Sequence, residues 1–200
     1  ENTPKPLLKI GGRPIIENII RQFIDHGFYE FYISTHYKSE QIREYLKDGS
    51  QYGVKIHYVH EDTPLGTAGS LGLLPKDIPD LPMIVMNGDL LTKVDLGNLL
   101  EFHNASKFDA TMGIREYDVQ IPFGVVAIND GKIESMREKP LQKFFVNAGI
   151  YVLNNNLIKK INGSLYLDMP DFLKNEIKNN NVNAFPIHEY WNDIGRIEEY

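Results

Sequence analysis

The sequence predicts an α/β domain with a mixed, mostly parallel sheet that is flanked by helices. Over roughly the first 105 residues, short apolar segments alternate with helical patterns, which is typical of βαβ units. After that point several strand-like segments follow one another, joined by the strong turn signal Asn129-Asp130-Gly131. No internal repeat, low-complexity linker or change of composition divides the chain. We therefore expect a single domain over residues 1–200.

The composition is that of a soluble globular protein. The 200 residues are 42% hydrophobic and 24% charged, and their number is enough to form one sizeable core. A formal charge of −6 argues against a broad surface for nucleic acid. Without cysteine, the chain has neither a disulfide framework nor a thiolate metal site. No apolar run approaches the ~18 residues of a membrane span, and no signal peptide is visible, so we expect a cytoplasmic protein.

Apolar periodicity and helix signals place the elements of the first half. Pro14 suits the start of a helix and Gly27 its end, while Ser39 suits the cap of the next helix. Gly11-Gly12 lacks the spacing of a phosphate-binding loop and is expected to form a turn. The expected helices are 14–27, 39–49, 68–74 and 95–106, and the expected strands are 31–35, 54–58 and 83–86.

The second half is expected to be partly antiparallel. Strands are expected at 110–115, 124–128, 132–137, 147–153 and 182–187, with a helix at 169–178.

Residues 83–89 carry the first indication of a ligand site. Four apolar residues, β-branched at Ile84 and Val85, predict a strand that is buried on both faces of the sheet. Asn87-Gly88 ends this strand and places Asp89 at its carboxyl end, where open α/β sheets bind ligands. The structural alternative is an aspartate that merely caps the next turn.

Two further segments suit a phosphorylated nucleoside. Pro4 and Pro6 exclude Lys5 from a helix and hold it on a stiff, extended segment, as a fixed charge for a phosphate would require. The segment 61–69 ends in Gly66-Thr67-Ala68-Gly69, whose small residues would let a flat ligand lie against the backbone. The alternatives are a solvated lysine and a tight strand-to-helix turn, respectively.

Two later segments add charge to the pattern. Arg137-Glu138-Lys139-Pro140 follows an expected strand, and Trp191-Asn192-Asp193-Ile194-Gly195 offers a second carboxylate in an apolar setting. Surface solubility and turn capping are the alternatives. The six histidines show no metal-ligand spacing, and no GxSxG motif is present.

Taken in order, these segments resemble the sugar-1-phosphate nucleotidyltransferases, and most closely the mannose-1-phosphate guanylyltransferase-like members. The resemblance covers nearly the whole chain and rests on seven motifs. They are Pro4-Lys5-Pro6-Leu7-Leu8, Pro64-Leu65-Gly66-Thr67-Ala68-Gly69, Asn87-Gly88-Asp89, Phe123-Gly124-Val125-Val126, Glu138-Lys139-Pro140, Asn147-Ala148-Gly149-Ile150-Tyr151 and Trp191-Asn192-Asp193-Ile194-Gly195.

The resemblance implies a Rossmann-like sheet that converts an NTP and a sugar 1-phosphate to an NDP-sugar and pyrophosphate with Mg²⁺. It implies that Asp89 and Asp193 hold the Mg²⁺, for which carboxylate oxygens are suitable ligands. Lys5 would neutralise the NTP phosphates, Lys139 would hold the sugar phosphate and Glu138 a sugar hydroxyl. The other substrate-binding residues implied are Glu61, Leu65, Gly66, Thr67 and Gly88, together with Gly124, Asn147 and Gly149 in the sugar pocket.

Glu61 also favours one nucleotide. In thymidylyl- and uridylyl-transferring relatives the matching residue is typically glutamine. A carboxylate only accepts hydrogen bonds, and guanine offers two adjacent donors, N1–H and the 2-amino group. We therefore expect GTP, with UTP or dTTP as the alternative.

One part of the family pattern does not occur in this sequence. A first strand and a GGxGxRLxPLT-type loop are expected immediately before Glu1, and a further region is expected after Tyr200. We therefore expect the sequence to be a fragment, and to be inactive if no phosphate loop is supplied.

A non-catalytic sugar-nucleotide-binding regulatory domain and a glycosyltransferase are competing hypotheses. Lys5, Asp89, Lys139 and Asp193 together argue against the regulatory domain, and a glycosyltransferase has no evident need for Lys5 or for the Glu138-Lys139 pair. The expected partners are the NTP and the sugar 1-phosphate, with no nucleic acid and no membrane, and a homo-oligomer remains open.

Overall fold

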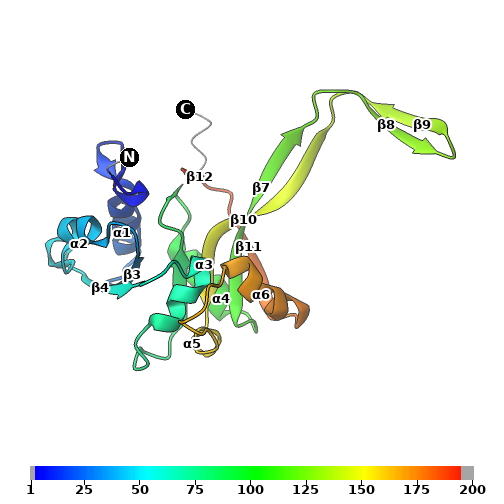
Figure 1. Cartoon of the computed structure of the whole chain (residues 1–200). Helices are drawn as coiled ribbons and strands as arrows, with labels where there is room; N and C mark the ends of the chain where they lie inside the picture. Colours follow the sequence, from blue (N-terminus) through cyan, green and yellow to red (C-terminus); the bar gives the residue numbers. More distant parts are fainter. Residues whose placement is uncertain (1–2, 195–200) are drawn as a thin grey trace.

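The computed structural model describes residues 3–194, and its centre is a four-stranded mixed sheet (Figure 1). The strands are β5 (Met83–Met86), β7 (Ala110–Gln120), β10 (Leu141–Leu153) and β11 (Val182–Pro186), in the order β11-β7-β10-β5. β10 runs antiparallel to β5 and to β7, whereas β11 runs parallel to β7. Only β10 is therefore reversed relative to the others. The predicted mixed α/β sheet is confirmed.

A second, parallel pair lies beside the central sheet. β3 (Glu30–Thr35) and β4 (Lys55–His60) pair in parallel through the crossover helix α2 (Ser39–Leu46), and α1 (Ile15–Asp25) packs next to them. Before α1, the 3₁₀ turn η1 (Lys5–Leu7) leads into a small hairpin of β1 (Lys9–Ile10) and β2 (Arg13–Pro14). The 3₁₀ turn η2 (Ser50–Tyr52) precedes β4.

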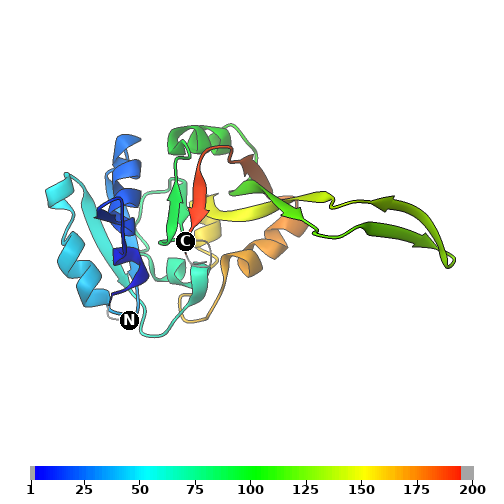
Figure 2. The ribbon, with the colours of Figure 1, turned by 90° about the horizontal axis from the view of Figure 1, so that it is seen from above.

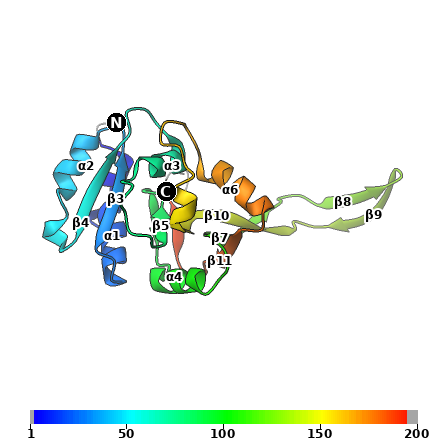
Figure 3. The same ribbon diagram turned by 90° about the horizontal axis from the view of Figure 1, so that it is seen from below.

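The two faces of the central sheet are covered by different helices, as Figure 3 shows. α4 (Leu96–Asn104) packs with α1 on one face, where alternate residues of β10 such as Ile150 join their cluster. α5 (Asn155–Ile158) and α6 (Met169–Lys178) cover the other face, against Tyr151. β5 contributes to both clusters. Its residues are nevertheless only half-buried, because β5 pairs with β10 alone among the described strands. The expectation of a strand buried on both faces was wrong to that extent.

Several local expectations can be compared with the structure directly. Gly11 and Gly12 form the expected turn, with φ of +62° and +85°. Asp95 caps α4, since its Oδ1 accepts from the amide of Asn98 at 2.9 Å. The expectation for Ser39 was wrong: it is the first residue of α2, and Lys38 takes the cap position at φ +53°. The expected helix at 68–74 is a turn of α-helix, α3 (Gly66–Gly69), followed by the 3₁₀ turn η3 (Ser70–Leu73).

A long arm leaves the body of the molecule (Figures 1 and 2). It is formed by the outer parts of β7 and β10 and ends in a hairpin of β8 (Val125–Asn129) and β9 (Lys132–Arg137). The turn at 129–131 has φ of +47° at Asp130 and +77° at Gly131, as its sequence predicts. β7 and β10 are much longer than expected, because their outer parts pair with each other and not with the core. One face of the hairpin is apolar and 41–67% exposed, and consists of Val126, Ile128, Ile133 and Met136.

Candidate active site

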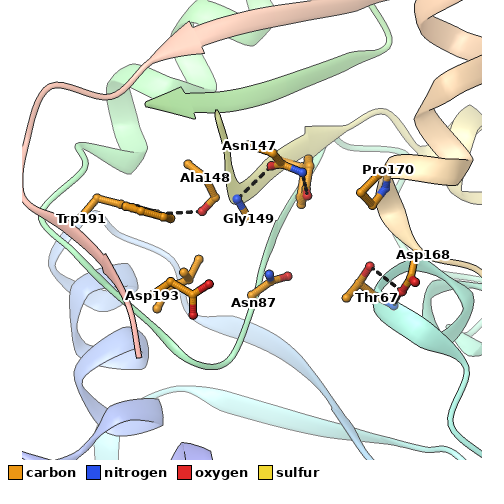
Figure 4. Close-up of a pocket in the computed structure, with 11 residues that line it drawn as sticks. Thr67, Asn87, Asn147, Ala148, Gly149, Asp168, Pro170, Trp191 and Asp193 are labelled. Atoms are coloured by element: carbon orange, nitrogen blue, oxygen red, sulfur yellow. Dashed lines mark hydrogen bonds between the residues drawn. The ribbon is translucent and has the colours of Figure 1, made fainter. Parts of the chain in front are cut away.

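A cavity of about 310 Å³ lies where β5 ends, beside the base of the arm (Figure 4). Its walls come from the segment after β5, the start of the inner part of β10, the last described strand and the segment that leads into α6. The lining residues are Thr67, Asn87, Leu90, Asn147, Ala148, Gly149, Tyr151, Asp168, Pro170, Trp191 and Asp193. Three of them, Thr67, Asn147 and Gly149, were expected from the sequence as substrate-binding residues, and Asp193 was expected as a metal ligand.

A bulge in β10 shapes the centre of this cavity. The pairing of β10 with β7 shifts register between Asn147 and Tyr151. The side chain of Asn147 holds the bulge, since its Oδ1 accepts from the amide of Gly149 at 3.0 Å and its Nδ2 donates to the Tyr151 hydroxyl at 2.6 Å. Gly149 has φ +69°, and a Cβ there would lie 2.7 Å from Nδ2 of Asn87. Only glycine fits, so the side chain of Asn87 can lie against bare backbone.

The two expected metal ligands are brought together by a strand pair that the sequence did not predict. β6 (Leu90–Thr92) and β12 (Trp191–Asp193) are antiparallel, and the amide of Ile194 donates to the carbonyl oxygen of Asp89 at 3.0 Å. Burial raises the pKa of Asp89, the negative charge of Asp193 raises it further, and the charge of Lys5 opposes both effects. Gly195, the last residue of the predicted motif, lies outside the described residues.

Two carboxylates are too few to hold a metal ion by protein ligands alone, but they suit Mg²⁺ that also binds phosphate and water. Within residues 3–194, no group of three or more histidine, aspartate or glutamate side chains could hold a metal ion. Mg²⁺ commonly takes only one or two carboxylates and completes its octahedron with phosphate oxygens and water. Asp89 and Asp193 offer that donor set, and the repulsion between them would be relieved by a cation.

Lys5 lies close enough to Asp89 to lower its pKa. Its backbone forms the 3₁₀ turn η1, so the expectation of an extended segment was wrong. The neighbouring ring of Pro6 lies 3.8 Å from the position of a Cβ on Gly88, which packs this turn against the end of β5. Lys5, Gly88 and Asp89 are therefore neighbours in the fold, as the resemblance implied.

The turn after β4 is held by Glu61. The hydroxyl of Ser34 donates to its Oε1, and the amide of Leu65 donates to its Oε2 at 2.8 Å. Leu65 itself is buried, so its side chain packs inside the protein, whereas Thr67 reaches the cavity wall. A carboxylate oxygen that accepts one hydrogen bond can accept a second, so both Glu61 oxygens have further acceptor capacity.

Three expected substrate-binding residues lie on the arm and not in the cavity wall. A Cβ on Gly124 would be 3.0 Å from Oε2 of Glu138, and the amide of Lys139 donates to the carbonyl of Phe123 at 3.3 Å. They therefore neighbour one another where the β8–β9 hairpin joins the rest of the arm. Lys139 precedes Asn147 by eight residues, or about 25 Å of extended strand.

Sequence reasoning did not single out several of the lining side chains. Tyr151 lies within one of the family motifs but was given no role, although regular strand alternation already places residues 147 and 151 on one face. Asp168 resembled an ordinary helix start before α6, and nothing local revealed its contact with Thr67. Trp191 was quoted without a role. Its indole donates to the carbonyl of Ala148 at 2.8 Å and so ties β12 to the cavity.

A comparison with protein-family models matches the nucleotidyl transferase family over residues 1–200. The chain belongs to this family. Among curated relatives, a probable mannose-1-phosphate guanylyltransferase 1 from Oryza sativa is 32% identical, with 100% of this chain and 57% of the relative aligned. A bifunctional protein GlmU from Methanococcus maripaludis is also 32% identical, over 98% of this chain and 47% of the relative. The chain spans about half the length of these curated relatives.

Solved structures of low sequence identity have the same fold. HddC from Yersinia pseudotuberculosis is 24% identical and superimposes with a TM-score of 0.74, covering 100% of this chain and 88% of the other. A further structure of HddC was solved in complex with GMP-PN and has a TM-score of 0.73 at 22% identity, covering 99% of this chain and 87% of that one. The expected nucleotide-diphospho-sugar transferase type of fold is thereby confirmed. No helix in residues 3–194 has the length and apolar character to cross a membrane.

Proposed function

We propose that this nucleotidyl transferase family protein transfers a nucleotidyl group from an NTP to a sugar 1-phosphate. The observation that carries the proposal is the adjacency of Asp89, Asp193 and Lys5 at the edge of the 310 Å³ cavity. Two carboxylates and an ammonium group suit a metal-bound polyphosphate, and the adjoining cavity has polar walls suited to a sugar. The name of the Oryza sativa relative, a probable mannose-1-phosphate guanylyltransferase, supports the same reaction class.

The reaction itself asks for little proton chemistry. An oxygen of the sugar phosphate forms a bond to the α-phosphorus, the bond to the bridging oxygen of the β-phosphate breaks, and pyrophosphate leaves with that electron pair. The attacking oxygen is already anionic, so no general base is needed, and positioning with charge neutralisation carries the rate. Bound at Asp89 and Asp193, Mg²⁺ would supply much of that neutralisation. Lys5 stabilises the NTP phosphates and the leaving pyrophosphate.

Asn147 and Gly149 form the floor on which the sugar lies. Because Gly149 carries no side chain, a sugar ring can approach the backbone of the bulge, while Asn147 is locked by its bonds to Gly149 and Tyr151. Lys139 would bind the sugar phosphate and Glu138 a sugar hydroxyl, as the family resemblance implies, and Gly124 lies beside Glu138 on the arm.

GTP is the favoured nucleotide within this proposal. A carboxylate oxygen can accept two hydrogen bonds, so Glu61 can accept from N1–H and the 2-amino group of guanine while Ser34 and the Leu65 amide hold it in place. The rice relative, named as a guanylyltransferase, is consistent with this choice. UTP and dTTP are the alternatives, because a change of one side chain can alter base selection.

The test is a pyrophosphate-release assay on the full-length polypeptide with Mg²⁺, four NTPs and a panel of sugar 1-phosphates. We expect turnover with GTP, and mannose 1-phosphate among the accepted sugars. Asp89→Asn should lower turnover strongly, whereas the matched control Asp130→Asn, in the turn of the distant hairpin, should not. A clear preference for UTP or dTTP would refute the choice of GTP. Nucleotide binding without pyrophosphate release from any pair would instead identify a regulatory binding domain.

A further inference from the structure

The turn that contains Thr67 is docked onto a segment distant in sequence. The amides of Ala68 and Gly69 both donate to the carbonyl of Leu167, at 2.9 and 3.0 Å, and the amide of Leu167 donates back to the carbonyl of Leu65 at 2.8 Å. The turn after β4 and the approach to α6 therefore form one unit. Any displacement of the second segment would move the first.

Asp168 is the polar centre of this unit. Its Oδ1 accepts from the amide of Thr67 at 3.1 Å and from the Thr67 hydroxyl at 3.3 Å, and its Oδ2 accepts from the Tyr166 hydroxyl at 2.8 Å. The Thr67 hydroxyl in turn accepts from the amide of Met169 at 2.8 Å. The hydrogen bond from the Thr67 amide lowers the pKa of Asp168, with a further contribution from Tyr166, so the carboxylate is charged at neutral pH.

Steric fit makes the arrangement dependent on close contact. Gly66 has φ +76°, and a Cβ at this position would lie 2.7 Å from the carbonyl oxygen of Leu167 and 2.9 Å from Oδ1 of Asp168. The backbone of the turn thus lies directly against the carboxylate. Thr67 and Asp168 also both line the cavity, as Figure 4 shows, so the contact forms part of its wall.

A carboxylate close to bound phosphates is electrostatically unfavourable unless hydrogen-bond donors of the protein stabilise its negative charge. The charge of Asp168 is used within the protein, on the amide and hydroxyl of Thr67 and on Tyr166. Charge-assisted hydrogen bonds of this kind are stronger and geometrically stricter than neutral ones. Asp168 therefore suits the orientation of a turn better than contact with an anionic substrate.

We propose that Asp168 is a positioning residue for the nucleotide: through Thr67 it holds the Gly66–Thr67 backbone in the conformation that receives the nucleoside of the NTP. The inference rests on the proposed nucleotidyl transfer and assigns a role to a residue outside its metal and phosphate contacts. In this role Asp168 acts before chemistry, on NTP binding, through the backbone of Thr67.

The experiment compares Asp168→Ala, Asp168→Asn and Thr67→Val in the full-length polypeptide. Loss of the orienting bonds in Asp168→Ala should raise the KM for the NTP about tenfold, equivalent to roughly 1.4 kcal/mol. The KM for the sugar 1-phosphate should rise clearly less than the KM for the NTP, and kcat should stay within about threefold. Asp168→Asn retains an oxygen for the Thr67 amide and should recover most of the loss. Asp171→Ala is the matched control, because Asp171 lies on the same helix and pairs with Lys174 outside the cavity.

A double-mutant cycle tests whether the two side chains act together. The Asp168→Ala/Thr67→Val double variant should bind NTP little more weakly than Asp168→Ala alone, because both changes remove the same contact. Equal changes in both KM values and in kcat, or fully additive effects, would overturn the proposal. If Asp168→Ala does not fold, Asp168→Asn and Thr67→Val carry the same comparison.

Equilibrium binding of a non-hydrolysable GTP analogue separates this inference from the proposed function. A wild-type protein that binds no NTP contradicts the proposed function. If Asp168→Ala binds the analogue as tightly as the wild-type protein does, the proposed role of Asp168 is wrong.

Discussion

The carboxylate of Asp193 raises the pKa of Asp89, because the antiparallel pairing of β12 with β6 brings the two like charges together. Asp89 is also partly removed from water, so the repulsion is poorly screened. Such a pair of like charges does not stabilise the fold. It would, however, provide two ligands for a divalent cation that also binds phosphates.

Replacing either carboxylate should therefore affect activity and stability in opposite directions. Asp89→Asn and Asp193→Asn should each lower kcat on the order of 100-fold or more, with partial recovery at high Mg²⁺. The melting temperature of the metal-free protein should stay unchanged or rise, because one of two repelling charges is gone. Pyrophosphate release against Mg²⁺ concentration, together with thermal unfolding in EDTA, measures both effects. Full activity in both variants would rule out the metal assignment.

Lys139 offers a test of whether the arm takes part in the reaction. Lys139→Ala should raise the KM for the sugar 1-phosphate about ten- to a hundredfold, since a charge-assisted phosphate contact contributes about 1.5–3 kcal/mol. The KM for the NTP should change little. Lys143→Ala is the control, because Lys143 is on the same arm and pairs with Glu116 at 2.6 Å. If Lys139→Ala behaves like Lys143→Ala in steady-state kinetics, the arm is not part of the sugar site.

The Tyr45–Glu17 contact makes alkaline stability depend on one phenol. The Tyr45 hydroxyl donates to Oε2 of the buried Glu17, and Nε of Arg21 donates to Oε1 of the same carboxylate. The hydrogen bond to Glu17 is the main cause that raises the pKa of Tyr45 to about 12. A raised folded-state pKa contributes stability that is present below the ordinary value of 10 and is lost as pH rises toward 12. Tyr45→Phe should cost roughly 1 kcal/mol at pH 7, since Tyr45 is partly exposed.

The difference in unfolding free energy between wild type and Tyr45→Phe should then shrink between pH 10 and 12. Urea denaturation at several pH values measures it. Other tyrosines with raised pKa values, such as Tyr58 and Tyr151, titrate equally in both proteins and cancel from the difference. A difference that stays constant with pH would contradict the assigned bond.

His103 is buried, and both of its ring nitrogens have hydrogen-bond partners. The Nδ2 group of Asn154 donates to Asp109. The other side of the same amide, Oδ1 of Asn154, therefore faces Nε2 of His103 at 3.0 Å. Nε2 is therefore the donor, and in the neutral imidazole Nδ1 accepts from the hydroxyl of the fully buried Thr111 at 2.8 Å. Thr111→Val keeps the shape and leaves Nδ1 without a donor. It should destabilise the protein by about 1–3 kcal/mol in urea unfolding. Thr111→Ser should retain most of the stability, and equal losses in both variants would point to packing as the cause.

The elements that form from local periodicity were predictable from the sequence. α1 buries Ile16, Ile20 and Phe23 on one side as their spacing indicates, and Asp95 caps α4 through a side chain that reaches only three residues along. The order of the motifs was also sufficient to identify the family, because each motif marks a strand end or turn whose backbone is set by nearby glycines and prolines. These features depend on interactions within a few residues.

The arrangement of the site depends on contacts between residues that are far apart in the sequence. Asp89 ends a strand visible in the sequence, but the side chain that raises its pKa arrives on β12, which pairs with β6 over a large sequence separation. The same is true of Asp168, which looked like a helix start until the docking of its segment on Thr67 was known. The sequence by itself determined the family and most of the elements that surround the candidate residues. Only the tertiary structure decided which of those residues meet, because strand pairing, the β10 bulge and the direction of the arm arise from packing between distant segments.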